Sequence, residues 1–242
     1  METYTQIKSN LKKLKLSSFY ENIDHRIQEA IDTKMGYADF LLLLTQDEID
    51  RRKIRKQENS IKKANLGRYK RLLEFDFDFN VKINRQQILQ FSSCEFIKRN
   101  ENIFFVGPAG VGKTFLAKAI AHEACVKGFS AIFSRTQKML EYIYSGKADT
   151  TEHKKMSQFL KPDILILDDW GLQAFPNHLL NILNEIISER YERGSIIITS
   201  NRSLENWHEL FSEPVVSSAL LDRLFHNAHK IIIEGKSYRK SL

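Results

Sequence analysis

A glycine-rich segment in the middle of the chain is the feature that most constrains the fold. Its residues are Gly107, Pro108, Ala109, Gly110, Val111, Gly112, Lys113 and Thr114. An apolar run at 103–106 precedes it, and a helical pattern begins near Lys113. In the order strand, loop and helix, glycines let backbone N–H groups converge on phosphate oxygens, and the helix N-terminus adds partial positive charge. The segment therefore predicts a phosphate-binding loop. We expect Lys113 to reach the terminal phosphates, the Thr114 hydroxyl to bind Mg²⁺, and Phe115 to belong to the same nucleotide-binding site.

Two carboxylates follow a second apolar run, at 164–167. They are Asp168 and Asp169. Ligands of open α/β sheets bind at the carboxyl ends of the strands, so both acids should lie beside the phosphate loop. We expect Asp168 to contribute to the Mg²⁺ site and Asp169 to orient or deprotonate an attacking water. Two acids after a strand are otherwise typical of a turn or a helix cap, but together with the phosphate loop they predict nucleotide hydrolysis.

The second half of the chain alternates short apolar runs with helical patterns. The expected strands lie at 103–106, 131–133, 164–167, 196–199 and 231–233, and the expected helices at 113–127, 137–145, 152–160, 178–193 and 217–226. Strands that are almost entirely apolar are buried on both faces, as in a parallel sheet covered by helices. The pattern therefore predicts an α/β domain.

The first part of the chain has a different character. Residues 1–73 contain no proline, and their apolar residues recur at helical spacing, including a long helix expected over 37–55. The pattern changes at Phe75, Phe77 and Phe79, which alternate with polar residues. We therefore expect a helical N-terminal domain at 1–73 and the α/β core at 74–242.

Positive charge is concentrated in one segment. The chain has 37 Lys and Arg against 30 Asp and Glu, and residues 51–71 carry ten of these basic residues against the single acid Glu58. Such a run neutralises phosphates and releases their counterions, which favours nucleic acid as a partner, although a solvated helix face remains the alternative. A second, weaker basic region lies between 133 and 164. The candidate DNA contacts are Arg51, Arg52, Lys53, Arg55, Lys56, Lys62, Lys63, Arg68, Lys138 and Lys147.

Cysteine content and hydropathy exclude several classes of protein. Cys94 and Cys125 cannot build a disulfide framework, and no apolar stretch near the start is typical of a secretory signal. The apolar run at 40–44 is far shorter than the roughly 20 residues that cross a bilayer. We expect a cytoplasmic protein without a membrane partner.

Several motifs carry a resemblance to a known family. Asp168 to Leu172 (DDWGL), Trp207 to Glu209 (WHE), Leu221 to His229 (LDRLFHNAH) and Gly235 to Lys240 (GKSYRK) are similar to motifs of the IstB family. These proteins are AAA+ ATPases, the ATP-binding helpers of bacterial insertion sequences, and are related to replicative helicase loaders. The resemblance implies an AAA+ P-loop NTPase fold, a three-layer core around a parallel sheet. Because the chain ends at Leu242, shortly after the last expected strand, we expect the helical lid of this class to be absent or truncated.

The resemblance also implies roles for individual residues. Asn201 matches the polar sensor beside the γ-phosphate, Arg223 the arginine finger supplied to a neighbouring subunit, and Arg239 the second sensor arginine. Lys113 and Asp169 complete the expected catalytic set. Because Asp169 is one methylene shorter than the glutamate of most AAA+ motors, we expect slow hydrolysis.

The function implied is that of a transposition helper. With ATP and Mg²⁺ bound, such a protein assembles on duplex DNA as a ring or spiral of identical subunits and recruits or activates a cognate transposase, and hydrolysis resets it. Two alternatives remain open at this point. One is a replicative helicase loader that binds single-stranded DNA, and the other is a nucleotide-dependent DNA-binding protein with negligible turnover.

Overall fold

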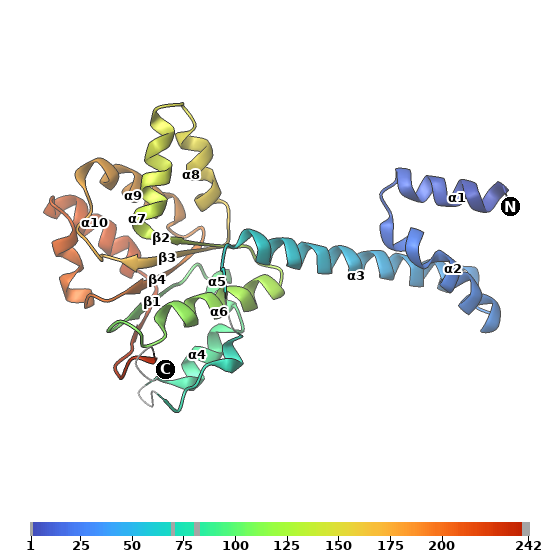
Figure 1. The fold of residues 1–242 in the computed structure, drawn as a ribbon, viewed down its shortest axis with the longest axis horizontal. Coiled ribbons are helices and arrows are strands. Elements are labelled where there is room, and N and C mark those ends of the chain that lie inside the picture. Colours follow the sequence, from blue (N-terminus) through green and yellow to red (C-terminus); the bar gives the residue numbers. More distant parts are fainter. Residues whose placement is uncertain (1, 69–70, 80–82, 239–242) are drawn as a thin grey trace. The chain divides into compact units, whose positions relative to one another are not determined.

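A computed structural model describes residues 2–68, 71–79 and 83–238 of the 242-residue chain (Figure 1). The chain divides into two compact units, Met1–Asn59 and Ser60–Leu242. The nucleotide-binding motifs all lie in the second unit, so we describe the first unit only briefly.

The first unit is helical, as expected. It contains α1 (Glu2–Lys13), α2 (Ser17–Asp32) and the beginning of α3 (Tyr37–Lys63). Leu11, Ile23 and Leu44, one from each helix, are buried. Polar contacts join α2 to α3 as well, since Arg26 donates to both carboxylate oxygens of Asp47 at 2.9 and 2.7 Å. The apolar periodicity of this part of the sequence therefore produces helices that pack through one face.

Helix α3 is longer than expected and carries the boundary between the two units. It continues past Arg55 to Lys63, and the chain leaves the helical conformation at Asn65, with φ +53°, and Gly67, with φ +61°. The boundary lies at 59/60, earlier than the expected 73/74, because Ala64, Leu66 and Leu72 are buried in the core of the second unit.

The second unit is built on a five-stranded parallel sheet, which confirms the expected class. The strands are β1 (Asn102–Val106), β2 (Ala131–Arg135), β3 (Ile164–Trp170), β4 (Ser195–Ser200) and β5 (Ala228–Ile232), in the order β2-β3-β4-β1-β5. All residues of β1 and β4 are buried, whereas the edge strands β2 and β5 are partly exposed. The strands with almost entirely apolar sequences therefore occupy the centre of the sheet.

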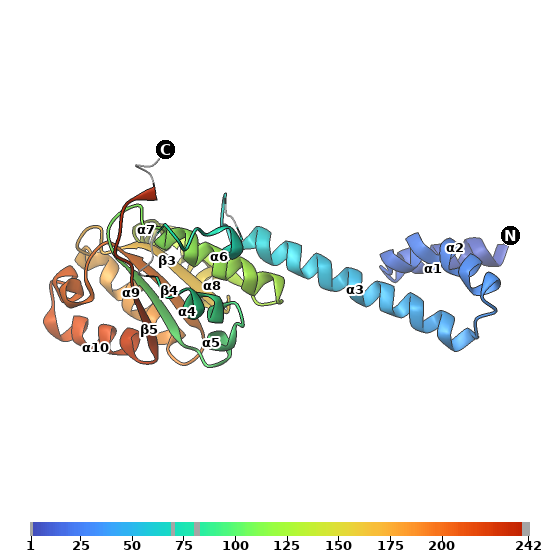
Figure 2. The same ribbon diagram turned by 90° about the horizontal axis from the view of Figure 1, so that it is seen from below.

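Helices cover both faces of this sheet and complete three layers (Figure 1, Figure 2). Alternate strand residues face opposite sides: Phe105 belongs to a core with the helices of one face and Phe104 to a core with those of the other. The first face carries α4 (Arg85–Phe91), α5 (Glu95–Lys98) and α6 (Lys113–Val126). The second carries α7 (Thr136–Tyr144), α8 (Glu152–Leu160), α9 (Asn177–Arg190) and α10 (Pro214–Phe225). Short 3₁₀ helices lie at η1 (Leu72–Glu74), η2 (Ser145–Lys147) and η3 (Leu204–Leu210).

Helices α4 and α5 were not expected from the sequence. Each is too short for a clear apolar period, and α4 begins at a local cap in which the Asn84 side chain accepts from the Gln87 N–H. Ile88 and Phe91 anchor α4 by burial, so tertiary packing stabilises this segment.

No helix within the described part of the chain is both long enough and apolar enough to span a bilayer.

Candidate nucleotide site

The phosphate loop connects β1 to α6, as its sequence predicts. Gly110, with φ +84°, and Gly112, with φ +99°, adopt backbone conformations that residues with a Cβ rarely take. A Cβ at Gly112 would also lie 2.6 Å from the Phe75 ring. Helix α6 begins at Lys113, so the loop delivers its backbone to a helix N-terminus, where anions bind favourably.

The Lys113 ammonium is buried within the loop that carries it. It donates to the carbonyl oxygens of Gly107 at 2.8 Å and Pro108 at 2.7 Å, and to Asn201 Oδ1 at 2.6 Å. The structure therefore brings the expected sensor residue, at the end of β4, into direct contact with the expected phosphate-binding lysine. The cation and the amide together form a polar group at the carboxyl edge of the sheet.

Asp168 lies at the centre of a network of hydroxyl groups. Its Oδ1 accepts from Thr114 Oγ1 at 2.7 Å and from Thr199 Oγ1 at 2.5 Å, and its backbone carbonyl accepts from Thr136. The carboxylate and the Thr114 hydroxyl are both oxygen ligands, which Mg²⁺ prefers, and few protein ligands suffice when nucleotide phosphates and waters supply the others. These two residues therefore fit the metal that the motif implies.

Asp169 turns away from Asp168 into a different environment. Its backbone has φ +56°, its N–H donates to Thr199 Oγ1 at 3.3 Å, and its side chain is 38% exposed. Its Oδ2 lies 3.4 Å from Nε of Arg135, the last residue of β2. Sequence reasoning missed this partner, although parallel pairing of β2 with β3 places Arg135 opposite Asp168 in register.

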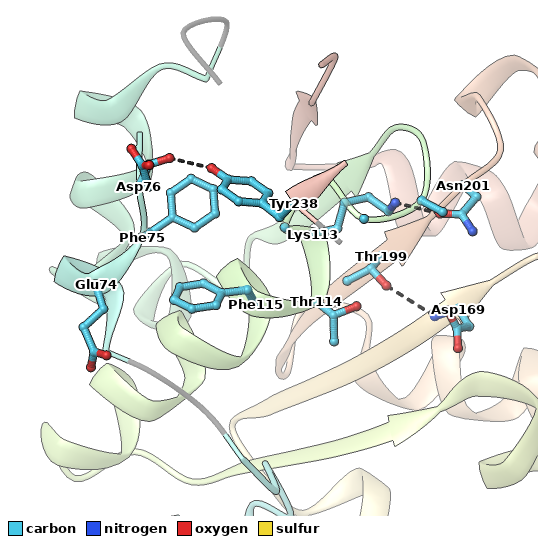
Figure 3. A pocket seen from close by; sticks show the side chains of 13 residues that line it. Glu74, Phe75, Asp76, Lys113, Thr114, Phe115, Asp169, Thr199, Asn201 and Tyr238 are labelled. Carbon is cyan, nitrogen blue, oxygen red and sulfur yellow. Dashed lines mark hydrogen bonds between the residues drawn. The ribbon is translucent and has the colours of Figure 1, made fainter. Parts of the chain in front are cut away.

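Lys113, Thr114, Asp169 and Asn201 line one cavity of about 480 Å³, which has two chemically different ends (Figure 3). Asp168 and Arg135 are not among its lining residues but contact two of them, Thr114 and Asp169. Asp169, Thr199 and Asn201 form a polar end, and Phe75, Phe115 and Tyr238 form an aromatic end, with Lys113 and Thr114 between them. The other lining residues are Glu74, Asp76, Ala109, Gly110 and Gly112. Val111 does not line the cavity because it is buried in the core. The sequence analysis named Asp169, Asn201 and Phe115 as site residues, whereas the places of Thr199 and Tyr238 came from the structure.

Of the two arginines with roles implied by the family resemblance, the structure describes one, and it lies away from this cavity. Arg223, on α10, lines a smaller cavity of about 180 Å³ with Asn102 and Asn227. Asn102 begins β1 and Asn227 precedes β5, so this cavity lies at the opposite edge of the sheet from the phosphate loop. Arg239 lies outside the described residues.

Most of the candidate DNA contacts are exposed, but three of these basic residues are ion-paired. Arg51 pairs with Glu21 through two hydrogen bonds, and Arg52 Nε lies 2.8 Å from Glu48 Oε1. Lys147 Nζ lies 3.9 Å from Glu152 Oε1. The side-chain hydrogen bond from Arg51 lowers the pKa of the Glu21 carboxyl. Arg51 is half-buried, and the exposed members are Arg52, Lys53, Arg55, Lys56, Lys62, Lys63, Arg68, Lys138 and Lys147.

Comparison with known families agrees with the motifs and the geometry. The family model described as IstB-like ATP binding protein matches residues 9–242. The chain belongs to this family. An ATP-binding protein of insertion sequence IS232 from Bacillus thuringiensis is 33% identical over 98% of this chain and 95% of that relative. An insertion-sequence ATP-binding protein of Mycobacterium tuberculosis is 33% identical over 96% of this chain and 93% of the relative.

Solved structures share the fold of this IstB-like protein. DnaI has a TM-score of 0.60 with 23% identity, covering 68% of this chain and 90% of its own. The DnaC helicase loader has a TM-score of 0.56 with 23% identity, covering 72% and 98%. AMPPCP-bound DnaA from Aquifex aeolicus has a TM-score of 0.58 with 21% identity, covering 70% and 51%. At these identities the likeness shows the AAA+ P-loop fold.

Proposed function

We propose that this protein is an ATP-dependent, DNA-binding helper of transposition that hydrolyses ATP to ADP and phosphate as a slow switch. One observation carries the proposal: Lys113, Thr114, Asp169 and Asn201 line a single cavity, and Thr114 donates a hydrogen bond to Asp168. The relatives' names, which join ATP binding to insertion sequences, support the cellular context.

The cavity has the groups that triphosphate hydrolysis requires. Lys113 is placed to donate to the terminal phosphate oxygens in exchange for its present carbonyl partners, and Asn201 lies beside it. Asp169 orients the attacking water and accepts its proton as the new oxygen–phosphorus bond forms and the bond to the bridging oxygen breaks. Thr114 and Asp168 would hold Mg²⁺, which when bound would neutralise developing charge on the phosphates. The Asp169 carboxylate is short and ion-paired with Arg135, which supports slow turnover.

The position of Arg223 supports a homo-oligomeric active form. Among the described residues, the lining of the nucleotide cavity includes no arginine, while Arg223 lies at the opposite edge of the sheet. From that edge Arg223 can reach the nucleotide of a second copy of the chain, where its guanidinium would stabilise the transferring phosphoryl group. ATP binding and assembly are thereby coupled, because a neighbouring subunit completes each site.

The decisive experiment measures ATP binding and assembly on DNA together. Lys113→Ala should abolish both, as followed by calorimetry with ATP and by light scattering with duplex DNA. Lys98→Ala is the control, since Lys98 is 59% exposed and pairs with Glu95 of the same short helix. Assembly of Lys113→Ala on DNA at the wild-type level would contradict the proposed switch. A preference for single-stranded over duplex DNA would instead favour a helicase loader.

A mixing experiment tests the arginine supplied by a neighbour. Lys113→Ala and Arg223→Ala should each hydrolyse little ATP alone. An equimolar mixture should regain activity, because some interfaces then combine an intact phosphate loop with an intact Arg223. No recovery in a mixture that still assembles would exclude Arg223 from this role. Stimulation of the wild-type ATPase by a cognate transposase tests the proposed partner.

A further inference from the structure

We propose that the aromatic end of the cavity binds the purine base of the nucleotide and that Tyr238, on the segment after β5, is the residue that stacks on it. The inference rests on the proposed function, because it needs a triphosphate anchored in the phosphate loop. It also gives a role to residues 233–238, here called the tail. The proposed hydrolysis mechanism does not explain the sequence motif in this tail.

The layout of the cavity fixes where a base must lie. Asn201 and Asp169 mark the end at which the terminal phosphate reacts, and Lys113 and Thr114 lie in the middle (Figure 3). A nucleotide whose phosphates follow the loop therefore extends its base toward Phe75, Phe115 and Tyr238. This end offers aromatic rings, and flat bases stack on such rings whatever their hydrogen-bonding edges.

Tyr238 is held in place at three points before any ligand arrives. Its hydroxyl donates to the Asp76 carbonyl at 2.5 Å, its backbone N–H donates to the Gly110 carbonyl at 3.0 Å, and its ring stacks on Phe79 with centroids 4.1 Å apart. Burial raises the pKa of the hydroxyl, so it remains a donor at neutral pH. A side chain fixed in this way loses little conformational entropy on binding.

The tail also makes close backbone contact with the phosphate loop. A Cβ at Gly107 would lie 2.0 Å from the Ile233 carbonyl oxygen, and a Cβ at Gly110 would lie 2.0 Å from Ser237 Oγ. The lack of a side chain at these glycines therefore lets the tail, as well as phosphate, lie close to the loop backbone. Whatever orders the phosphate loop also orders the segment that carries Tyr238.

Phe75 and Phe115 extend the aromatic surface beside Tyr238. The ring centroids of Phe75 and Phe115 are 5.3 Å apart, and that of Phe75 lies 5.7 Å from that of Tyr238. The Glu74 carboxylate, which also lines the cavity, accepts a hydrogen bond from the Arg71 N–H at 2.9 Å. An extended aromatic surface favours the larger stacking area of a purine over that of a pyrimidine.

The test separates the base from the phosphates. Calorimetry with Mg²⁺ compares ATP, CTP and inorganic tripolyphosphate on the full chain. Tyr238→Ala should weaken ATP binding by about 10- to 100-fold and erase the preference for ATP over CTP, while tripolyphosphate binding stays unchanged. Tyr238→Phe keeps the ring and loses the bond to Asp76, so its loss should be about 2- to 10-fold. Tyr37→Ala is the matched control, since Tyr37 is 92% exposed.

Each outcome bears on one of the two proposals. If Tyr238→Ala and Tyr238→Phe weaken ATP and tripolyphosphate equally, or leave ATP binding intact, the base site is wrong. Lys113→Ala should lose ATP and tripolyphosphate together. If the wild-type protein binds tripolyphosphate as tightly as ATP, the proposed base site is wrong, whereas the proposed phosphate site is supported. If it binds neither, the proposed function itself fails.

Discussion

Asp169, which we propose as the catalytic base, also adopts an unusual backbone conformation. Its φ of +56° is unusual for a residue with a Cβ, and Asp tolerates this region better than most because its short polar side chain bonds locally. The Asp169 N–H binds the same Thr199 hydroxyl that donates to Asp168. The hydroxyl of Thr199 thus bonds to both acids, for which we propose different tasks.

Replacing the proposed base tests that division of tasks. Asp169→Asn keeps the shape and the tolerated backbone conformation but cannot accept a proton, so hydrolysis should fall by about 100-fold or more. ATP affinity should stay within a few-fold, and the ATP-bound assembly on DNA should persist. Asp149→Asn, at an exposed turn, is the control. An unchanged rate of phosphate release would remove Asp169 from the mechanism.

Arg135 is expected to restrain Asp169. The two groups are 60% and 38% exposed, so solvent screening limits their ion pair to about 1 kcal/mol or less. Arg135→Ala should therefore raise basal ATP hydrolysis by only about 2- to 5-fold, by freeing the carboxylate for water. The rise should vanish in the Asp169→Asn background, and Lys138→Ala on the next helix is the control. A rate that falls in Arg135→Ala would show that this arginine assists the reaction instead.

At the scale of secondary-structure elements, one buried arginine joins three of them. Arg190, near the end of α9, is 2% exposed and donates to five carbonyl oxygens, those of Phe159, Leu160, Pro162, Asp163 and Ser195. These carbonyls lie at the end of α8, before β3 and in β4. Burial lowers the pKa of the guanidinium to about 10, so it remains charged at neutral pH.

Removing that guanidinium should destabilise the second unit without touching the nucleotide site. Arg190→Met leaves the buried carbonyls without donors and should cost about 3 kcal/mol in the free energy of unfolding. Arg193→Met is the control, because Arg193 is 73% exposed and pairs with Glu189, four residues earlier in the chain. Urea denaturation of both variants measures the difference. A loss below about 1 kcal/mol would contradict this account.

The phosphate loop and the tail form the second junction between elements. Gly110→Ala would place a methyl group against Ser237 and should weaken ATP binding by about 10-fold or more, as the loop or the tail must shift. Gly128→Ala is a matched control: its φ is also positive, at +93°, but nothing lies within 4 Å of the added Cβ. It should lose about 1 kcal/mol of stability and keep its ATP affinity. Equal ATP affinities in the two variants would exclude the steric explanation.

At the scale of the whole molecule, part of the positive charge of the basic segment 51–71 is paired with carboxylates of the protein. The basic segment begins with Arg51 and Arg52, whose charges are engaged by Glu21 and Glu48 in the first unit. The following Lys53, Arg55 and Lys56 are exposed on α3. Together with the exposed Lys62, Lys63 and Arg68, these three residues offer positive charge to the phosphates of the DNA that we propose as partner.

The salt dependence of DNA binding tests this assignment. Lys53→Gln, Arg55→Gln and Lys56→Gln combined should weaken duplex binding and flatten the slope of log K against log salt by up to about 3, since each phosphate contact contributes about 0.9. A control with the same charge change, Lys98→Gln, Lys127→Gln and Arg193→Gln, should change the slope little. Fluorescence anisotropy over a salt series measures both. Equal slopes for the two triple variants would make net charge, rather than this segment, responsible.

Local sequence patterns determined much of this protein. The phosphate loop, the acidic end of β3 and the parallel α/β core all follow from apolar runs, glycines and acids within a few residues of one another. Asn201 came from family resemblance, and its contact with Lys113 agrees with the implied place beside the phosphate loop. Such features are readable because strand and helix periods are local.

Contacts between distant segments were decided only by the tertiary structure. Arg135 meets Asp169 because β2 pairs beside β3, and Tyr238 meets Phe75 because the tail and the segment before β1 reach the same loop. The residues that follow α3 belong to the second unit because Ala64 and Leu66 are buried in its core. No local sequence pattern predicts these contacts, because they depend on the order of the strands and on which side chains the packed core brings together.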